Sequence, residues 1–132
     1  MDTAQTIDRI IDVFPAHQQG QVRVQLSVAL QGIMTQQLLP TADGSGRVVA
    51  TEVLVPNPAI RNLIREGKTH QIYSVLQTST ASGMQTMDAS LATLVRQGKI
   101  SQKLAESRSS TPEELRRLLG GTHLEVGQQM AA

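Results

Sequence analysis

At residues 58–67 the sequence reads Pro58-Ala59-Ile60-Arg61-Asn62-Leu63-Ile64-Arg65-Glu66-Gly67. Asn57 is a residue type that caps helices, and proline suits a first helical position because the N–H there needs no partner in the helix. Gly67 favours the left-handed conformation that often ends a helix. The stretch therefore predicts a short helix with defined ends.

This helix has an apolar side and a basic side. Ile60, Leu63 and Ile64 are spaced three and four residues apart and fall on one stripe, which is typical of a helix packed against a core. Arg61 and Arg65 are four residues apart and place like charges on another side. We expect an anionic partner for the arginines, and local pairing on an exposed face, such as Asn62 with Glu66, is the simpler alternative.

The residues before this helix predict two further helices. Apolar residues from Ile7 to Phe14 repeat with the helical period, and Asp2 with Gln5 forms a capping pair at the start. The helical period then continues from about His17 to Met34, so we expect a second helix there. Gly20 weakens it.

A strand pair is predicted next. Thr35–Leu39 and Arg47–Val55 are rich in β-forming residues and flank a turn-forming sequence at 41–46 that contains Asp-Gly and Gly. We expect an antiparallel hairpin.

Short helices are predicted towards the C-terminus. Thr69 is expected to cap one of them. The small, polar run Thr78–Gly83 is expected to form a mobile loop, and a linker between helical subdomains is the alternative. Another helix starts at Thr86 and closes at Gly98, and Ser101 caps the next. The sequence Thr-Pro-Glu-Glu at 111–114 is a capping box for a last helix, and a disordered tail is expected over 121–132.

The segment Ala-Ile-Arg-Asn-Leu-Ile-Arg-Glu at 59–66 resembles the signature of the twitching-motility, PilT-type ATPases that retract type IV pili, members of the type II/IV secretion ATPase family. Further similar segments occur in the order of that family, from about Asp2 to Leu119: residues 3–15, 36–39, 43–47 and 83–88. The resemblance implies an α/β fold, namely the C-terminal portion of a RecA-like P-loop ATPase core that is mostly helical with an antiparallel strand pair. It also implies three parts: 1–77 in the ATPase core, 84–120 in a C-terminal helical subdomain, and the tail.

The motifs that bind nucleotide in such ATPases are missing from the sequence. A phosphate-binding loop has the form G-x-x-x-x-G-K-[ST], but Gly44-Ser45-Gly46 is followed by Arg47 and Val48 and is expected to be a hairpin loop. No acidic metal-binding strand end follows a hydrophobic run. We therefore expect no catalytic, cofactor-binding or metal residue in this chain, and expect ATP and Mg²⁺ to bind elsewhere in the intact parent.

The resemblance further implies a homohexameric parent that works on pilus inner-membrane platform proteins at the cytoplasmic face of the inner membrane. Residues 59–66 would serve retraction rather than nucleotide contact, and absence of a tetracysteine metal motif favours the retraction branch. A non-catalytic interaction module that binds or regulates pilus or secretion motor rings is the alternative. The sequence leaves open whether the chain is part of an enzyme: the family it resembles hydrolyses ATP, but the chain lacks the nucleotide-binding motifs.

Composition and isolated residues narrow the remaining possibilities. The net charge of +1 and the presence of only Phe14 and Tyr73 as aromatics argue against nucleic-acid binding, including by a helical DNA-binding domain. No run is long enough for membrane insertion. The three histidines are widely spaced, so a metal site is not expected. Asp8 and Asp12 lie four apart, and a solvated face is a better interpretation than an acid–base pair.

Overall fold

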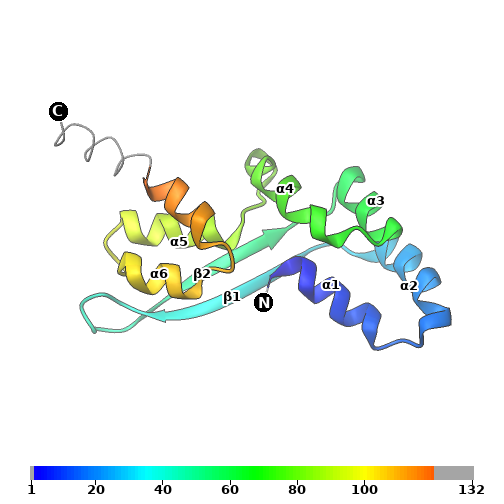
Figure 1. Ribbon diagram of the computed structural model, residues 1–132, viewed down its shortest axis with the longest axis horizontal. Coiled ribbons are helices and arrows are strands. Elements are labelled where there is room, and N and C mark those ends of the chain that lie inside the picture. Colours follow the sequence, from blue (N-terminus) through cyan, green and yellow to red (C-terminus); the bar gives the residue numbers. More distant parts are fainter. Residues whose placement is uncertain (1, 121–132) are drawn as a thin grey trace. The chain divides into compact units, whose positions relative to one another are not determined.

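The fold consists of short helices and one β-hairpin (Figure 1), and the computed structural model describes residues 2–120. The predicted disordered tail at 121–132 lies outside the described residues. The elements, in chain order, are α1 (Thr3–Asp12), α2 (Ala16–Ala29), β1 (Ile33–Pro40), β2 (Arg47–Leu54), α3 (Pro58–Glu66), the 3₁₀ helix η1 (Thr69–Gln71), α4 (Ile72–Gln77), the 3₁₀ helix η2 (Thr80–Ser82), α5 (Met87–Arg96), α6 (Gln102–Arg108) and a last helical segment over 112–120.

Helix α1 begins as its sequence predicts. The Asp2 carboxylate accepts the Gln5 backbone N–H at 2.7 Å, and the Gln5 side chain accepts the Asp2 N–H at 3.2 Å. These reciprocal bonds satisfy two N–H groups that have no partner within the helix. Ile7 and Ile11 are fully buried one turn apart, so the expected apolar stripe packs into the core.

Helix α2 is shorter than the sequence predicts. It ends at Ala29 instead of Met34, and Leu30 already has extended backbone angles. Ile33 and Met34 are instead the first residues of β1, whose side chains alternate between half-buried and exposed positions. The prediction was wrong because the apolar spacing around Ile33 fits both periods, and pairing with β2 selects the strand.

Strands β1 and β2 form the expected two-stranded antiparallel sheet. Its turn is closed by the Thr41 N–H, which donates to the Gly46 carbonyl at 2.9 Å. On the inward side, Leu39, Ala50 and Leu54 are fully buried. The outward side carries exposed residues, in keeping with the two-residue period of a strand.

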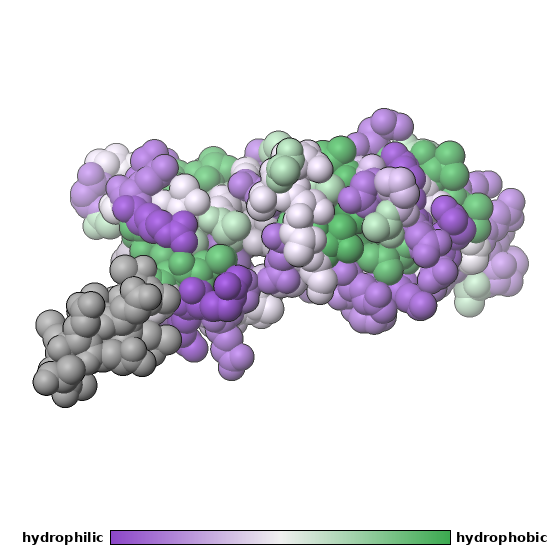
Figure 2. All heavy atoms as spheres, turned by 90° about the horizontal axis from the view of Figure 1, so that it is seen from above, coloured by the Kyte–Doolittle hydropathy of each residue, from purple (hydrophilic) through white to green (hydrophobic). Residues whose placement is uncertain are grey.

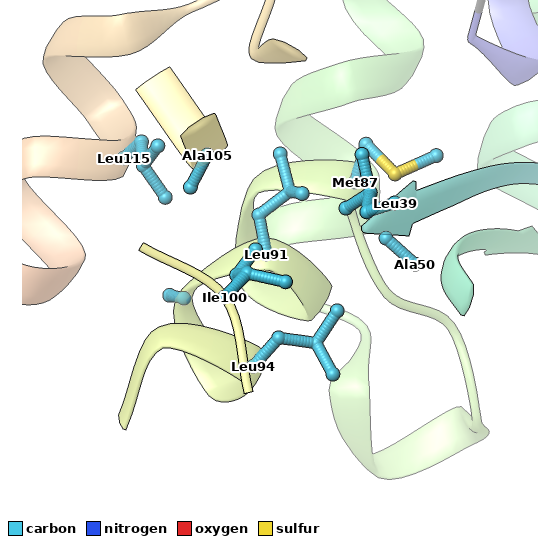
Figure 3. Close-up of a cluster of buried hydrophobic side chains, with 9 residues drawn as sticks. Leu39, Ala50, Met87, Leu91, Leu94, Ile100, Ala105 and Leu115 are labelled. Atoms are coloured by element: carbon cyan, nitrogen blue, oxygen red, sulfur yellow. The ribbon is translucent and has the colours of Figure 1, made fainter. Parts of the chain in front are cut away.

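The described chain forms two compact units: unit 1 contains residues up to 35 and 52–86, and unit 2 contains 36–51 and the residues from 87 onwards. The distal half of the hairpin thus belongs to unit 2, and the division into an ATPase-core part at 1–77 and a helical subdomain at 84–120 stays a prediction. Leu39 and Ala50 pack in one cluster with Leu91 (Figure 3), and such long-range contacts cannot be seen in the local sequence pattern.

Each unit has its own aliphatic core. In unit 1, buried residues come from α1, β2, α3, α4 and the segment before α5: Ile7, Ile11, Leu54, Ile60, Ile64, Ile72, Leu76 and Met84. In unit 2 they come from both strands, the C-terminal helices and the connection between α5 and α6: Leu39, Ala50, Met87, Leu91, Ala92, Leu94, Ile100, Ala105 and Leu115. Full burial of one large aliphatic side chain contributes roughly 1.5–3 kcal/mol, so these clusters are the main source of stability.

Two expectations for residues 69–83 need correction. Thr69 does not cap a helix: it lies inside η1, and its hydroxyl donates to the Asp8 carboxylate of α1 at 2.8 Å. The Thr78–Gly83 run, expected to be a loop, contains the 3₁₀ helix η2, which ends at Ser82 and is followed by Gly83 with φ of +83°. Short polar side chains can bond to nearby backbone, as Ser79 does to the Val75 carbonyl, and this gives the run local structure.

The C-terminal helices begin and end close to the predicted residues. Gly98 follows α5 with φ of +72°, and the Ser101 hydroxyl accepts the Leu104 N–H at 3.1 Å to cap α6. The last helical segment starts at Pro112. The hydroxyl of Thr111 donates to the buried carboxylate of Asp88, which lies in the first turn of α5.

Candidate functional site

Helix α3 carries the predicted site residues, and its ends form as the sequence predicts. The Asn57 side chain accepts the Ile60 N–H at 2.9 Å, Pro58 is the first helical residue, and Gly67 adopts φ of +73°. The Lys68 N–H then donates to the Leu63 carbonyl at 2.8 Å, which satisfies a carbonyl of the last turn.

The apolar side of α3 is anchored in unit 1. Ile60 and Ile64 are fully buried, and Leu63 is half-buried against the same cluster. Ala59 is exposed. Three of the eight signature residues therefore hold the helix in place rather than meeting a partner.

The two arginines have different environments. Arg61 is half-buried, and its Nη1 donates to the carbonyls of Ser27 at 2.7 Å, Val28 at 3.2 Å and Leu30 at 3.1 Å. Arg61 thus binds the C-terminal end of α2, where carbonyls have no helical partner and the helix dipole is negative. The sequence interpretation of an outward-facing charge does not hold for Arg61.

Arg65 and its neighbours remain on the surface. Arg65 is exposed, with Nη1 3.5 Å from the Asn62 side-chain oxygen. Asn62 donates to Glu66 at 3.3 Å, as the local pairing alternative predicted, and Glu66 forms an ion pair with Lys68 at 3.2 Å. These contacts are long or exposed and contribute little stability, so Asn62, Arg65 and Glu66 are available to a partner.

Helix α2 supplies an arginine that the sequence analysis missed. Arg23 lies beside Gly67, since a Cβ placed on Gly67 would be 3.5 Å from the Arg23 guanidinium carbon. Its Nη1 atom is buried and has no hydrogen-bond partner within the described residues. A basic residue near the C-terminus of a neighbouring helix is favourable for the dipole. Nothing in the period of α2 marks Arg23, because the contact depends on how α2 and α3 pack.

Glu52 is a second polar residue that the sequence did not reveal. It lies on β2, is 2% exposed, and accepts both the Thr3 backbone N–H at 2.7 Å and the Thr3 hydroxyl at 2.9 Å. A carboxylate at the first turn of α1 complements the helix dipole and its unpaired N–H groups. Glu52 therefore ties α1 to the hairpin, and its contacts are those of a structural residue.

The remaining candidates do not converge on a reactive centre. Asp8 bonds to Thr69, Asp12 is exposed, and His17 and His70 are exposed and far apart in sequence. His123 lies outside the described residues. Across residues 2–120, no group of three or more metal-binding side chains gathers. Within that same range, no helix is both long and apolar enough to cross a bilayer.

Asp43 in the hairpin turn has a clear physical role. Its carboxylate accepts the Ser45 hydroxyl at 2.7 Å, the Ser45 N–H at 2.9 Å and the Thr41 hydroxyl at 2.8 Å. The bonds from Ser45 and Thr41 lower the pKa of Asp43 from 3.8 to about 2. These hydrogen bonds stabilise the ionised carboxylate, and they belong to the hairpin loop that the sequence predicts.

Comparison with known proteins gives a consistent relationship. No protein-family model matches the chain. A protein of Neisseria gonorrhoeae named twitching motility protein is 55% identical over 112 residues, which is 85% of this chain and 30% of the relative. The type IV pilus retraction ATPase PilT of Pseudomonas aeruginosa is 48% identical over 110 residues, 83% of this chain and 32% of the relative.

A solved structure agrees with these relatives. The crystal structure of the pilus retraction motor PilT with bound ADP matches with a TM-score of 0.77 and 50% identity, over 88% of this chain and 32% of that one. The chain thus spans about a third of the length of the proteins it matches. It is related in sequence and fold to a segment of the PilT-type retraction ATPases.

Proposed function

We propose, from this relationship to the pilus retraction ATPases, that the chain is the C-terminal segment of a motor that powers type IV pilus retraction and twitching motility. The parent would be a homohexamer that binds ATP and Mg²⁺ outside this segment. It would act on inner-membrane platform proteins at the cytoplasmic face. The segment itself would supply mechanical and contact surfaces.

The division of labour on α3 is the observation that carries this proposal. Ile60, Leu63 and Ile64 fix the helix in unit 1, and Arg61 binds the end of α2. The remaining polar side, with Asn62, Arg65 and Glu66, makes only exposed or local contacts. This polar side is charged, is held in place by the buried side of α3, and makes only local contacts among the described residues, which suits contact with another subunit or a pilus-machinery protein.

The test is the substitution Arg65→Ala in the parent gene. Because Arg65 is exposed, the variant should fold and hydrolyse ATP at the parental rate, while the twitching zone on agar should be lost. Arg108→Ala removes another exposed arginine, in unit 2, and is the matched control that should twitch normally. Normal twitching by the Arg65→Ala strain, at equal protein level, would show that the exposed side of α3 is not needed for retraction.

A further inference from the structure

The packed pair α2 and α3 carries arginines with which no acidic side chain among the described residues forms a direct ion pair. Within the described residues, Arg23, Arg61 and Arg65 form no ion pair with an acidic side chain, whereas Lys68 pairs with Glu66. Over residues 2–120, the hydrogen bonds of Arg61 go to neutral carbonyls, and the buried Nη1 of Arg23 has no hydrogen-bond acceptor. The charged residues of α2 and α3 are Arg23, Arg61, Arg65 and Glu66, so the two helices carry a net formal charge of +2, and Glu66 is already paired with Lys68.

The contacts place these arginines in one row. Arg61 reaches the C-terminal end of α2, and Gly67 at the end of α3 lies beside Arg23 in the middle of α2. The two helices therefore run in opposite directions. Arg65, one turn beyond Arg61 on the same side of α3, lies between these two contact points and is exposed.

Apolar side chains accompany the charge. Val24 and Val28 are one turn apart on α2 and are 47% and 69% exposed. Arg61 binds the carbonyls of Ser27, which lies between them in the sequence, and of Val28 itself. Apolar residues reach the surface elsewhere too, scattered among polar ones (Figure 2), but here one of the two valines offers its carbonyl to an arginine that has no ion-pair partner among the described residues.

We propose that Val24, Val28 and Arg65, here called the α2–α3 ridge, are a docking surface for an acidic amphipathic helix of a protein partner. This rests on the proposed function, since it gives the partner of α3 a chemistry. Acidic side chains of the partner helix would pair with Arg65 and be attracted by the positive charges of Arg61 and Arg23. Apolar side chains of the same helix would pack on Val24 and Val28. Charge complementarity sets orientation and rate, and the apolar contact adds affinity. A nucleic acid backbone would satisfy the arginines but leave the valines uncovered.

The experiment measures fluorescence anisotropy of a labelled synthetic helical peptide with Glu and Leu on opposite sides, titrated with the full 132-residue chain. Binding is expected, and it should weaken as salt rises. Arg65→Glu and Val28→Asp should each weaken it about tenfold or more, because each places a negative charge on the ridge. The controls are Arg108→Glu, an exposed arginine of unit 2, and Val13→Asp, an exposed valine outside α2, and both should bind like the parent chain.

Three results would contradict the proposal that the α2–α3 ridge is a docking surface for an acidic helix. The first two are no binding of the peptide and equal binding by all four variants. The third is self-association of the chain that Arg65→Glu abolishes, because a second copy of the chain would then be the partner. Displacement of the peptide by a short DNA duplex that needs Arg65 but not Val28 would indicate nucleic acid instead. The proposed function fails separately: twitching that survives Arg65→Ala refutes a role in retraction, whatever the peptide does.

Discussion

Replacing Arg61 with alanine is expected to destabilise unit 1, although the sequence pattern places Arg61 on the polar side of α3. Its Nη1 has only two N–H groups for three carbonyls, so at most two of the contacts count as full hydrogen bonds. The 2.7 Å bond to Ser27 is half-buried, whereas the bond to Val28 is exposed. Adding one charge-assisted bond and the favourable helix-dipole term gives a loss of about 2 kcal/mol in the free energy of unfolding.

The assay is urea unfolding of the full chain followed by far-UV circular dichroism, together with hydrogen exchange at the Leu30 amide. That amide donates to the Leu26 carbonyl at 3.0 Å in the last turn of α2, so it should exchange faster in Arg61→Ala. Arg65→Ala, one turn away and exposed, is the matched control and should lose less than about 0.5 kcal/mol. Arg61→Lys should recover only part of the loss, since an ammonium group cannot bond to several carbonyls in the same fixed geometry.

Equal stability of Arg61→Ala and Arg65→Ala, with unchanged exchange at Leu30, would refute this reasoning. It would mean that water satisfies the carbonyls of α2 as well as the guanidinium does. In that case Arg61 would count with Arg65 as a residue available to a partner.

Two further predictions concern glycine and pH. Gly67→Ala should destabilise by about 1 kcal/mol because φ is +73°, whereas Gly20→Ala, inside α2 with nothing within 4 Å of the added Cβ, should stabilise by about 0.5–1 kcal/mol; thermal unfolding checks the opposite signs. The pKa of Asp43, lowered to about 2, means that its turn contacts contribute fully above about pH 4 and are lost as pH falls through about 2. An NMR titration of its carboxyl carbon should show this midpoint, and Ser45→Ala should move it up towards 3.8; a midpoint near 3.8 in the unsubstituted chain would contradict the turn geometry.

Local signals in the sequence predicted the ends of several elements correctly. Asp2 with Gln5, Asn57 with Gly67, and Ser101 act within four residues or one short helix, so their chemistry can be recognised without knowing the fold. The α/β class with an antiparallel strand pair was also correct, although that expectation came from resemblance to a family as well as from periodicity.

The failures involve residues whose partners are distant in sequence. Glu52 bonds to Thr3 across 49 residues, and no pattern near either residue marks that contact. The end of α2 was misplaced because its apolar period runs on through Leu30 to Ile33, and only packing shows which residues leave the helix. Arg61 was interpreted as exposed because i, i+4 spacing shows that two side chains share a side, but not what that side faces.

The contact between Arg61 and the end of α2 also orders events during synthesis. Arg61, which donates to the carbonyls of Leu30 and Ser27, follows these two residues by 31 and 34 positions in the chain. The two carbonyls therefore have no such donor until Arg61 has been synthesised. At about 5–20 residues per second, the ribosome needs some seconds to add the intervening residues, besides the length held in its exit tunnel. The hydrogen bonds from Arg61 to the end of α2 can thus form only after the hairpin has been synthesised. Unit 1 is therefore expected to fold as a whole and not one helix at a time.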